Sequence, residues 1–197
     1  MDVTDLDTDP LRQLGAWLDE AREAGAPMPE AMTIATASTD AAPSARLVVL
    51  RGLRAGLVFF TDGESDKVAE LTANPQAAAV LHWLVPVHRQ VRVAGAVSPV
   101  SVHDADEYWS RRPPAARITA AASHQSRVVA SREVLEAQVR ELASRLGDAD
   151  VPRPGRWGGF RLRPARVEFW QEAEDGLHDR FRYWRDGDGW AIERLSP

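Results

Sequence analysis

Hydroxyl and basic side chains gather where a predicted strand ends and a predicted helix begins. The stretch GLVFFTDGESDK closes an apolar run with a turn that carries Thr61, Ser65 and Lys67. Such donors at the start of a helix favour a phosphate group, because they add to the free backbone N–H groups there. Solvated surface charge with ordinary helix capping has the same composition, so both interpretations stay open at this point.

A second basic pair lies in the stretch RLVVLR, where Arg46 and Arg51 are five residues apart. Side chains alternate between the two faces of a strand. On a regular strand, this spacing predicts that the two guanidinium groups lie on opposite faces of the sheet.

Donors and aromatic rings are also dense in the second half of the chain. The segment SRRPPAARITAAASHQSR places an Arg-Arg-Pro-Pro turn and a polar Ser-His-Gln-Ser segment between predicted helices. The C-terminal third is rich in tryptophan: Trp157, Trp170, Trp184 and Trp190. Tryptophan is more often a core residue than a ligand stacker, but one ring could line a planar ligand. Residue types alone therefore favour a phosphorylated, planar ligand.

Several common catalytic patterns do not occur in the sequence. There is no cysteine and no HxxxH-type spacing with a carboxylate partner among the five histidines, which are His82, His88, His103, His124 and His178. We therefore expect no metal site. The sequence also lacks GxSxG, P-loop and GxGxxG motifs. It therefore gives no support for a nucleophile-elbow hydrolase, a P-loop NTPase or a Rossmann fold.

Composition limits the class of protein. The 197 residues carry a net charge of −5, which argues against a general nucleic-acid binder. The acidic N-terminus is unlike a signal peptide, and the longest apolar runs are too short to span a bilayer. We expect a cytoplasmic protein that binds neither nucleic acid nor membrane, built as a single domain over residues 1–197 with residues 1–8 flexible.

Hydrophobic periodicity and turn signals predict the elements that must position these residues. Asp9 and Pro10 mark the start of a helix that ends before residues 24–29. A short helix is expected within 64–75 and a broken helical region over 101–146. Strands are predicted at 31–38, 44–52, 56–63, 76–85, 89–100, 157–163, 165–172, 178–184 and 189–195. This pattern indicates one α+β domain with a mainly antiparallel sheet and peripheral helices.

Ten short motifs together resemble a known family. In order from about residue 9 to Pro197 they are RLVVLR, FFTDGESDK, NPQAAAVLHW, RQVRVAGAV, YWSRRP, SHQSR, VPRPGRWGGFRL, VEFWQ, LHDRFRY and ERLSP. They resemble the pyridoxine/pyridoxamine 5′-phosphate oxidases, which are flavoproteins with an FMN-binding split β-barrel. The resemblance implies FMN as cofactor, O2 as the oxidant that regenerates it, and a homodimer with FMN at the interface.

The resemblance also implies which residues bind FMN. Arg46 would reach the phosphate or ribityl region, Lys67 would supply charge to the phosphate, and Gln90 would lie by the isoalloxazine ring. Gln125 and Ser126 would bind from the second subunit, and Trp170 and Arg180 would close the site. The full implied cofactor set is Arg46, Leu47, Val48, Val49, Leu50, Arg51, Phe60, Thr61, Lys67, Gln90, Gln125, Ser126, Trp170 and Arg180. One position departs: the family usually has Arg where this chain has Asp66, and a carboxylate beside a phosphate is repulsive.

The substrate side of the resemblance is less complete. Its implied substrate set is Arg51, Tyr108, Arg112 and His178, of which Arg112 and His178 are the catalytic candidates. The family's phosphate-binding Lys is Arg51 here, its phosphate-binding Ser is Ala116, and the Arg that covers the substrate ring is Gly176. A basic N-terminal arm is also expected to be missing.

Three functions remain open from these matches and departures. The first is oxidation of pyridoxine or pyridoxamine 5′-phosphate to pyridoxal 5′-phosphate, with O2 converted to hydrogen peroxide. The second keeps the fold and FMN but oxidises a bulkier aromatic compound in phenazine-type biosynthesis, for which Gly176 would open the site. The third is a flavin-binding protein without turnover.

Overall fold

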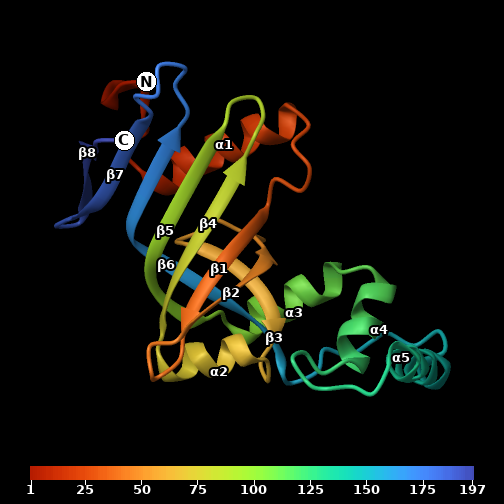
Figure 1. Ribbon diagram of the computed structural model, residues 1–197. Helices are drawn as coiled ribbons and strands as arrows, with labels where there is room; N and C mark the ends of the chain where they lie inside the picture. Colours follow the sequence, from red (N-terminus) through yellow and green to blue (C-terminus); the bar gives the residue numbers. More distant parts are fainter.

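An eight-stranded antiparallel sheet forms the frame of the molecule (Figure 1). The computed structural model describes residues 1–197. Its strands are β1 (Ala31–Ala37), β2 (Pro43–Val49), β3 (Leu57–Asp62), β4 (Gln76–Trp83), β5 (Arg89–Pro99), β6 (Trp157–Gln171), β7 (Asp179–Asp186) and β8 (Gly189–Arg194). Its helices are η1 (Val3–Asp5), α1 (Pro10–Glu23), α2 (Asp66–Ala73), α3 (Val102–Arg111), α4 (Pro114–Ala122) and α5 (Arg132–Leu146). The expected α+β class with a mainly antiparallel sheet is confirmed.

Strand β6 connects the two ends of the sheet. The order is β2-β1-β4-β5-β6-β7-β8, and β3 also pairs with β6. The first part of β6 pairs with β3 and its last part pairs with β7, while β5 runs along its other side. Beyond β2, Gly52 bridges to Val58 of β3. This bridge brings β3, which also pairs with β6, back to the chain that follows β2, so the sheet closes into a partial barrel at this end only.

The sequence predicted two strands where the structure has the single strand β6. The pairing between β5 and β6 shifts register between Ala94 and Gly95, where Pro164 cannot donate a ladder hydrogen bond. A Cβ atom at Gly95 would lie 2.0 Å from the carbonyl oxygen of Arg163. Glycine is therefore required at this bulge. Strand β6 continues through the bulge, so the two predicted strands are one.

Helix α1 covers the core at the end of the sheet where the chain termini lie (Figure 1). Asp9 caps it by accepting a hydrogen bond from the Leu11 backbone, as expected from Asp9-Pro10. Its buried face includes Trp17, whose ring meets Phe169 of β6 edge to face at 5.0 Å. Burial of such rings is a main source of folding free energy.

Residues 1–8 were expected to be flexible, but they contact the core. Leu6 is buried, and the amino group of Met1 lies 2.9 Å from an Asp179 carboxylate oxygen. The hydroxyl of Tyr183 donates to the carbonyl of Asp7. The structure thus ties this segment to β7.

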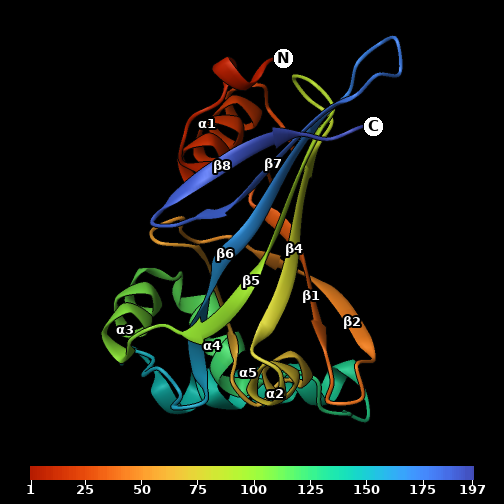
Figure 2. The ribbon, with the colours of Figure 1, turned by 90° about the vertical axis from the view of Figure 1, so that its left-hand side faces the viewer.

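Helices α2 to α5 lie at the opposite end of the sheet from the termini (Figure 2). The helical region over 101–146 divides into three helices, with Pro113 at the first break. Neither α4 nor α5 contains a buried residue. No helix in the chain combines the length and the apolar character needed to cross a membrane.

Candidate functional site

A cavity of about 1330 Å³ lies at the end of the sheet where α2, α3 and α4 gather. Most of the implied cofactor and substrate residues line it: Arg46, Leu47, Val48, Val49, Arg51, Phe60, Thr61, Lys67, Tyr108, Arg112, Gln125 and Ser126. Leu50 belongs instead to the hydrophobic core and is buried. The prediction that Arg46 and Arg51 face opposite sides was wrong. Strand β2 ends at Val49, so the alternation stops before Arg51 and both side chains line the same cavity.

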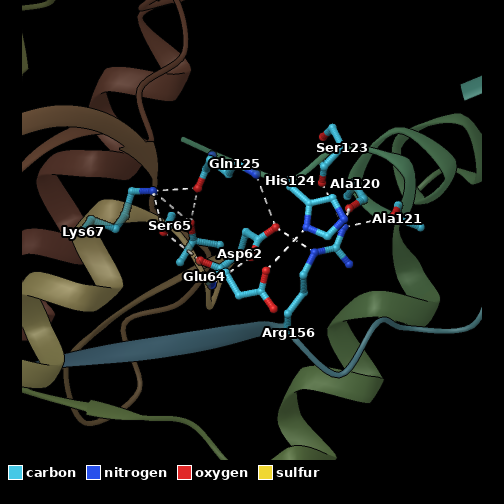
Figure 3. Close-up of polar contacts among 11 residues, drawn as sticks. Asp62, Glu64, Ser65, Lys67, Ala120, Ala121, Ser123, His124, Gln125 and Arg156 are labelled. Atoms are coloured by element: carbon cyan, nitrogen blue, oxygen red, sulfur yellow. Dashed lines mark hydrogen bonds and ion pairs between the residues drawn. The ribbon is translucent and has the colours of Figure 1, made fainter. Parts of the chain in front are cut away.

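Lys67, the only lysine in the chain, is buried at one end of this cavity. Its ammonium group donates to Thr61 Oγ1 at 3.1 Å, Ser65 Oγ at 3.2 Å and Gln125 Oε1 at 2.6 Å, as Figure 3 shows in part. No carboxylate forms an ion pair with it. Burial, followed by repulsion from Arg46, lowers the pKa of Lys67. A buried cation without a counter-ion favours an anionic ligand at this position.

Gln125 and Ser126 come from the same chain as Lys67, which corrects the expectation that they act from a second subunit. Gln125 Oε1 also accepts from the Thr61 hydroxyl at 2.7 Å, and Ser126 Oγ accepts from the backbone N–H of Asp66 at 3.3 Å. The loop after α4 therefore closes over the start of α2.

A buried ion pair, which residue types alone did not reveal, holds this loop in place (Figure 3). Arg156 Nε lies 3.0 Å from Asp62 Oδ2, and its Nη2 donates to the carbonyls of Ala121 and Ser123 at 2.9 Å each. Asp62 Oδ2 also accepts from the Gln125 backbone at 3.4 Å. Asp62 is the last residue of β3 and Arg156 comes just before β6. In the sequence, only the family-like motif VPRPGRWGGFRL could have indicated that Arg156 belongs to the site.

Arg46 shares the cavity but already has a partner within the chain. Its guanidinium lies 3.0 Å from Glu70 Oε2 and also donates to the hydroxyls of Thr36 and Ser44. Hydrogen bonds from Thr36, then from Arg46 and Ser44, lower the pKa of Glu70 against the effect of its burial. Arg46 is thus held in place by its neighbours and offers part of its charge to the cavity.

A second cluster of positive charge surrounds an aromatic stack in the same cavity. The Phe60 ring stacks on the rings of Tyr108 and Trp157, with ring centroids 4.0 Å and 5.4 Å apart, respectively. The Arg112 guanidinium lies 4.8 Å from the centre of the Trp157 ring, and its Nη1 atom is buried without a hydrogen-bond partner. Burial lowers the pKa of Arg112. Neither Arg112 nor Arg51 forms an ion pair, so this cluster also lacks an anion.

Gln90, Trp170, Arg180 and His178 do not line the cavity. Gln90, Trp170 and Arg180 are register partners across β5, β6 and β7, and the His178 ring lies 4.9 Å from the Trp170 ring. Trp170 lies thirteen positions after Trp157 along β6, which is roughly 40 Å of strand, and Trp157 lines the cavity. A single chain therefore keeps these residues apart from the cavity, at the other end of the sheet.

The positions that depart from the family pattern also have defined places. Asp66 and Ala116 line the cavity. Gly176 lies in the loop between β6 and β7 with a φ of +76°, and no atom lies within 4 Å of a Cβ built there. That space is open, but the backbone conformation favours glycine.

The residues present fit FMN. The cavity provides a buried ammonium group with hydroxyl and amide neighbours for a phosphate, and apolar and aromatic walls for a planar ring. No group of three or more His, Asp or Glu side chains is arranged to hold a metal ion.

Two family models match most of the chain. The model described as pyridoxamine 5′-phosphate oxidase matches residues 18–146, and the model described as pyridoxine 5′-phosphate oxidase C-terminal dimerisation region matches residues 157–197. The pyridoxine/pyridoxamine 5′-phosphate oxidase of Cupriavidus metallidurans is 48% identical over 98% of this chain and 92% of its own length. The protein of that name from Salinibacter ruber is also 48% identical, over 99% of this chain and 91% of its length.

Solved structures agree with these matches. PhzG from Burkholderia lata, in complex with tetrahydrophenazine-1-carboxylic acid, superposes with a TM-score of 0.92 at 36% identity, covering 98% of this chain and 95% of that one. A pyridoxamine 5′-phosphate oxidase-related, FMN-binding protein from Nostoc punctiforme has a TM-score of 0.75 at 19% identity, covering 96% and 98% of the two chains. The second likeness supports the split-barrel fold alone. The chain belongs to the pyridoxine/pyridoxamine 5′-phosphate oxidase family of FMN-dependent oxidases.

Proposed function

We propose that this protein oxidises pyridoxine or pyridoxamine 5′-phosphate to pyridoxal 5′-phosphate, with O2 reduced to hydrogen peroxide. One observation carries the proposal: a single cavity holds two separate positive clusters that have no anion of their own. Lys67 forms one, and Arg51 with Arg112 forms the other. Two phosphate groups, one from the cofactor and one from the substrate, would satisfy both.

The cofactor phosphate belongs at the Lys67 cluster. Lys67, Thr61, Gln125 and Ser126 converge there, and the phosphate would replace the counter-ion that the buried ammonium lacks. FMN, when bound, supplies the chemistry of hydride acceptance and of reaction with O2. The protein binds, orients and shields the reacting groups.

The substrate phosphate belongs at the aromatic stack. A phosphate there would pair with the guanidinium groups of Arg112 and Arg51, both of which line the cavity. The hydroxyl of Tyr108 would add a further donor. Ala116 offers no hydroxyl, which costs one hydrogen bond relative to the usual serine, or about 1 kcal/mol.

The remaining implied residues would come from a second copy of the chain. Gln90, Trp170, Arg180 and His178 lie too far along β6 to reach the cavity of their own chain. The match of residues 157–197 to a dimerisation region supports a homodimer. In that dimer, each cavity would be completed by the β5–β6–β7 end of the partner, with FMN between the two chains.

A second candidate is oxidation of a carboxylated tricyclic compound. The similarity to PhzG, which was solved with tetrahydrophenazine-1-carboxylic acid, supports it. The open space at Gly176, where the family has Arg, would admit a bulkier ring. A substrate carboxylate could use Arg112 in place of a phosphate.

Anaerobic reduction of the FMN-loaded protein tests these functions against one another. We expect pyridoxine or pyridoxamine 5′-phosphate to bleach the flavin absorbance, and Arg112→Met to raise the concentration needed without changing the FMN content. Bleaching by dihydrophenazine carboxylates alone would support the second candidate. If no amine, alcohol or reduced aromatic compound bleaches the flavin, the protein binds FMN without turnover and both proposals are wrong.

A further inference from the structure

His82 occupies the same cross-strand row as three residues with an implied cofactor role. The register pairs His82 of β4 with Gln90 of β5, Gln90 with Trp170 of β6, and Trp170 with Arg180 of β7. These four strands lie side by side in Figure 2. Directly paired residues in a sheet share a face. His82 therefore lies on the same face of the sheet as Gln90, Trp170 and Arg180, at the Gln90 end of the row.

A hydrogen-bond chain leads from His82 to an exposed carboxylate. His82 Nε2 and His88 Nε2 are 2.8 Å apart, and His88 Nδ1 lies 3.2 Å from Glu172 Oε2. The ionised carboxylate only accepts hydrogen bonds, so the proton of neutral His88 is on Nδ1 and its Nε2 is an acceptor. His82 must then donate from Nε2. Its own Nδ1 keeps a free lone pair.

His178 has the opposite arrangement. Its Nδ1 accepts from the backbone N–H of Ala173 at 3.2 Å, which places the proton of the neutral ring on Nε2. His178 can therefore donate a hydrogen bond to a ligand, but it has no free lone pair to take a proton. The Trp170 ring lies between the two histidine systems, 4.9 Å from His88 and 4.9 Å from His178.

We propose that His82 is a catalytic base of the site, with His88 and Glu172 as positioning residues that pass its proton to solvent. The inference rests on the proposed function, in which this row of one subunit faces the cavity of the other. Oxidation of a carbon–nitrogen or carbon–oxygen single bond removes two electrons and two protons. Bound FMN would supply the acceptor for the hydride that leaves the carbon, and His82 Nδ1 would accept the proton that leaves the heteroatom as the double bond forms.

The relay then carries the charge away from the site. Protonation of His82 Nδ1 allows its Nε2 proton to pass to His88, and the Nδ1 proton of His88 to pass to Glu172. The side chain of Glu172 is 53% exposed in the single chain and releases this proton to water. Both rings are then in the opposite tautomers, and the base is restored when His82, which is exposed, loses its Nδ1 proton to water and a proton returns along the chain from Glu172. A carboxylate that fixes the tautomer of one imidazole and stabilises its charged form is a recurring arrangement in acid–base catalysis.

The tautomers give a test that does not depend on turnover. In FMN-loaded protein labelled with 15N-histidine, we expect His88 to carry its proton on Nδ1 and His82 to carry it on Nε2. His82→Phe and His88→Gln assign the two signals. A His82 ring protonated on Nδ1 in its neutral form would overturn the relay.

Chemical rescue gives the functional test. We expect His82→Ala to slow anaerobic flavin reduction by roughly 10²- to 10⁴-fold, as for loss of a general base, and added imidazole to restore much of the rate. Affinity for FMN, measured by flavin fluorescence, should stay unchanged. His103→Ala, in an exposed position of α3, is the matched control and should react like the unmodified protein.

The outcomes separate the relay from the proposed function. If the unmodified protein reduces its flavin and His82→Ala does so at the same rate, the relay is wrong and the proposed function stands. A slow variant that imidazole does not rescue also contradicts a base at His82. If the unmodified protein never reduces its flavin, the proposed function is wrong, whatever the tautomers show.

Discussion

Replacement of Lys67 by methionine removes the buried cation at the end of the cavity where we propose that the cofactor phosphate binds, while keeping an unbranched side chain. The ammonium group gives three hydrogen bonds, to Thr61, Ser65 and Gln125, and has no carboxylate partner. A hydrogen bond from a charged group contributes about 1.5–3 kcal/mol. Because 1.4 kcal/mol is tenfold in affinity, Lys67→Met should weaken FMN binding by roughly 10- to 150-fold.

The same substitution should change the pH dependence of the stability of the FMN-free protein. Burial lowers the pKa of Lys67 below the ordinary lysine value of 10.5, so in the window just below pH 10.5 the unfolded chain binds more protons than the folded one. The free energy of unfolding therefore rises with pH through that window. Lys67→Met should lack this rise and should be more stable than the parent at neutral pH, because no unpaired charge is buried.

Flavin fluorescence titrations with FMN and riboflavin isolate the phosphate contact. Riboflavin has no phosphate, so its affinity should change little, and the ratio of the two affinities should fall in Lys67→Met. Arg145→Met, at an exposed position near the end of α5, is the matched loss of a cation outside the cavity. An equal loss of riboflavin and FMN affinity, or an unchanged FMN affinity, would refute the assignment of Lys67 to the phosphate.

Substitutions at three further positions test other parts of the site. Asp66→Asn should tighten FMN binding by roughly three- to tenfold without changing the affinity for riboflavin, because a carboxylate that lines the cavity repels the phosphate. An unchanged dissociation constant for FMN would mean that the Asp66 side chain points away from the phosphate. Asp62→Asn leaves Arg156 buried without its partner, and urea unfolding should show a loss of about 3–5 kcal/mol. Gly176→Ala and Gly176→Arg should both cost about 1 kcal/mol in thermal unfolding because φ is +76°. Only Gly176→Arg should lower the KM for phosphorylated pyridines, and equal KM values for the two variants would contradict a guanidinium contact.

Local signals in the sequence predicted the parts of the site that are built from neighbouring residues. Asp9 and Pro10 start α1 as expected, and the strand-to-helix turn at Thr61, Ser65 and Lys67 forms one cluster. These features depend on backbone hydrogen bonds and side chains only a few residues apart. Capping and turn preferences are enough to predict them.

Features that depend on long-range pairing could not be predicted in the same way. The alternation argument failed for Arg51 because β2 ends two residues before it, and the bridge from Gly52 to Val58 of β3 that follows is indicated by no local pattern. Likewise, the fold of the loop after α4 decides which chain supplies Gln125, and the Asp62–Arg156 pair fixes that loop across 94 residues of sequence. The sequence resemblance identified these residue types but not the chain from which each one acts.

The length of β6 has a consequence for mixtures of inactive variants. Since one strand keeps the cavity and the Gln90–Trp170–Arg180 row at opposite ends of each chain, damage to either end leaves the other intact. In the proposed dimer, a pair formed from one chain altered at Lys67 and one altered at Trp170 would combine both changes at one of its two sites and have neither at the other. Such complementation would restore one working site in every mixed pair, although each variant alone has none.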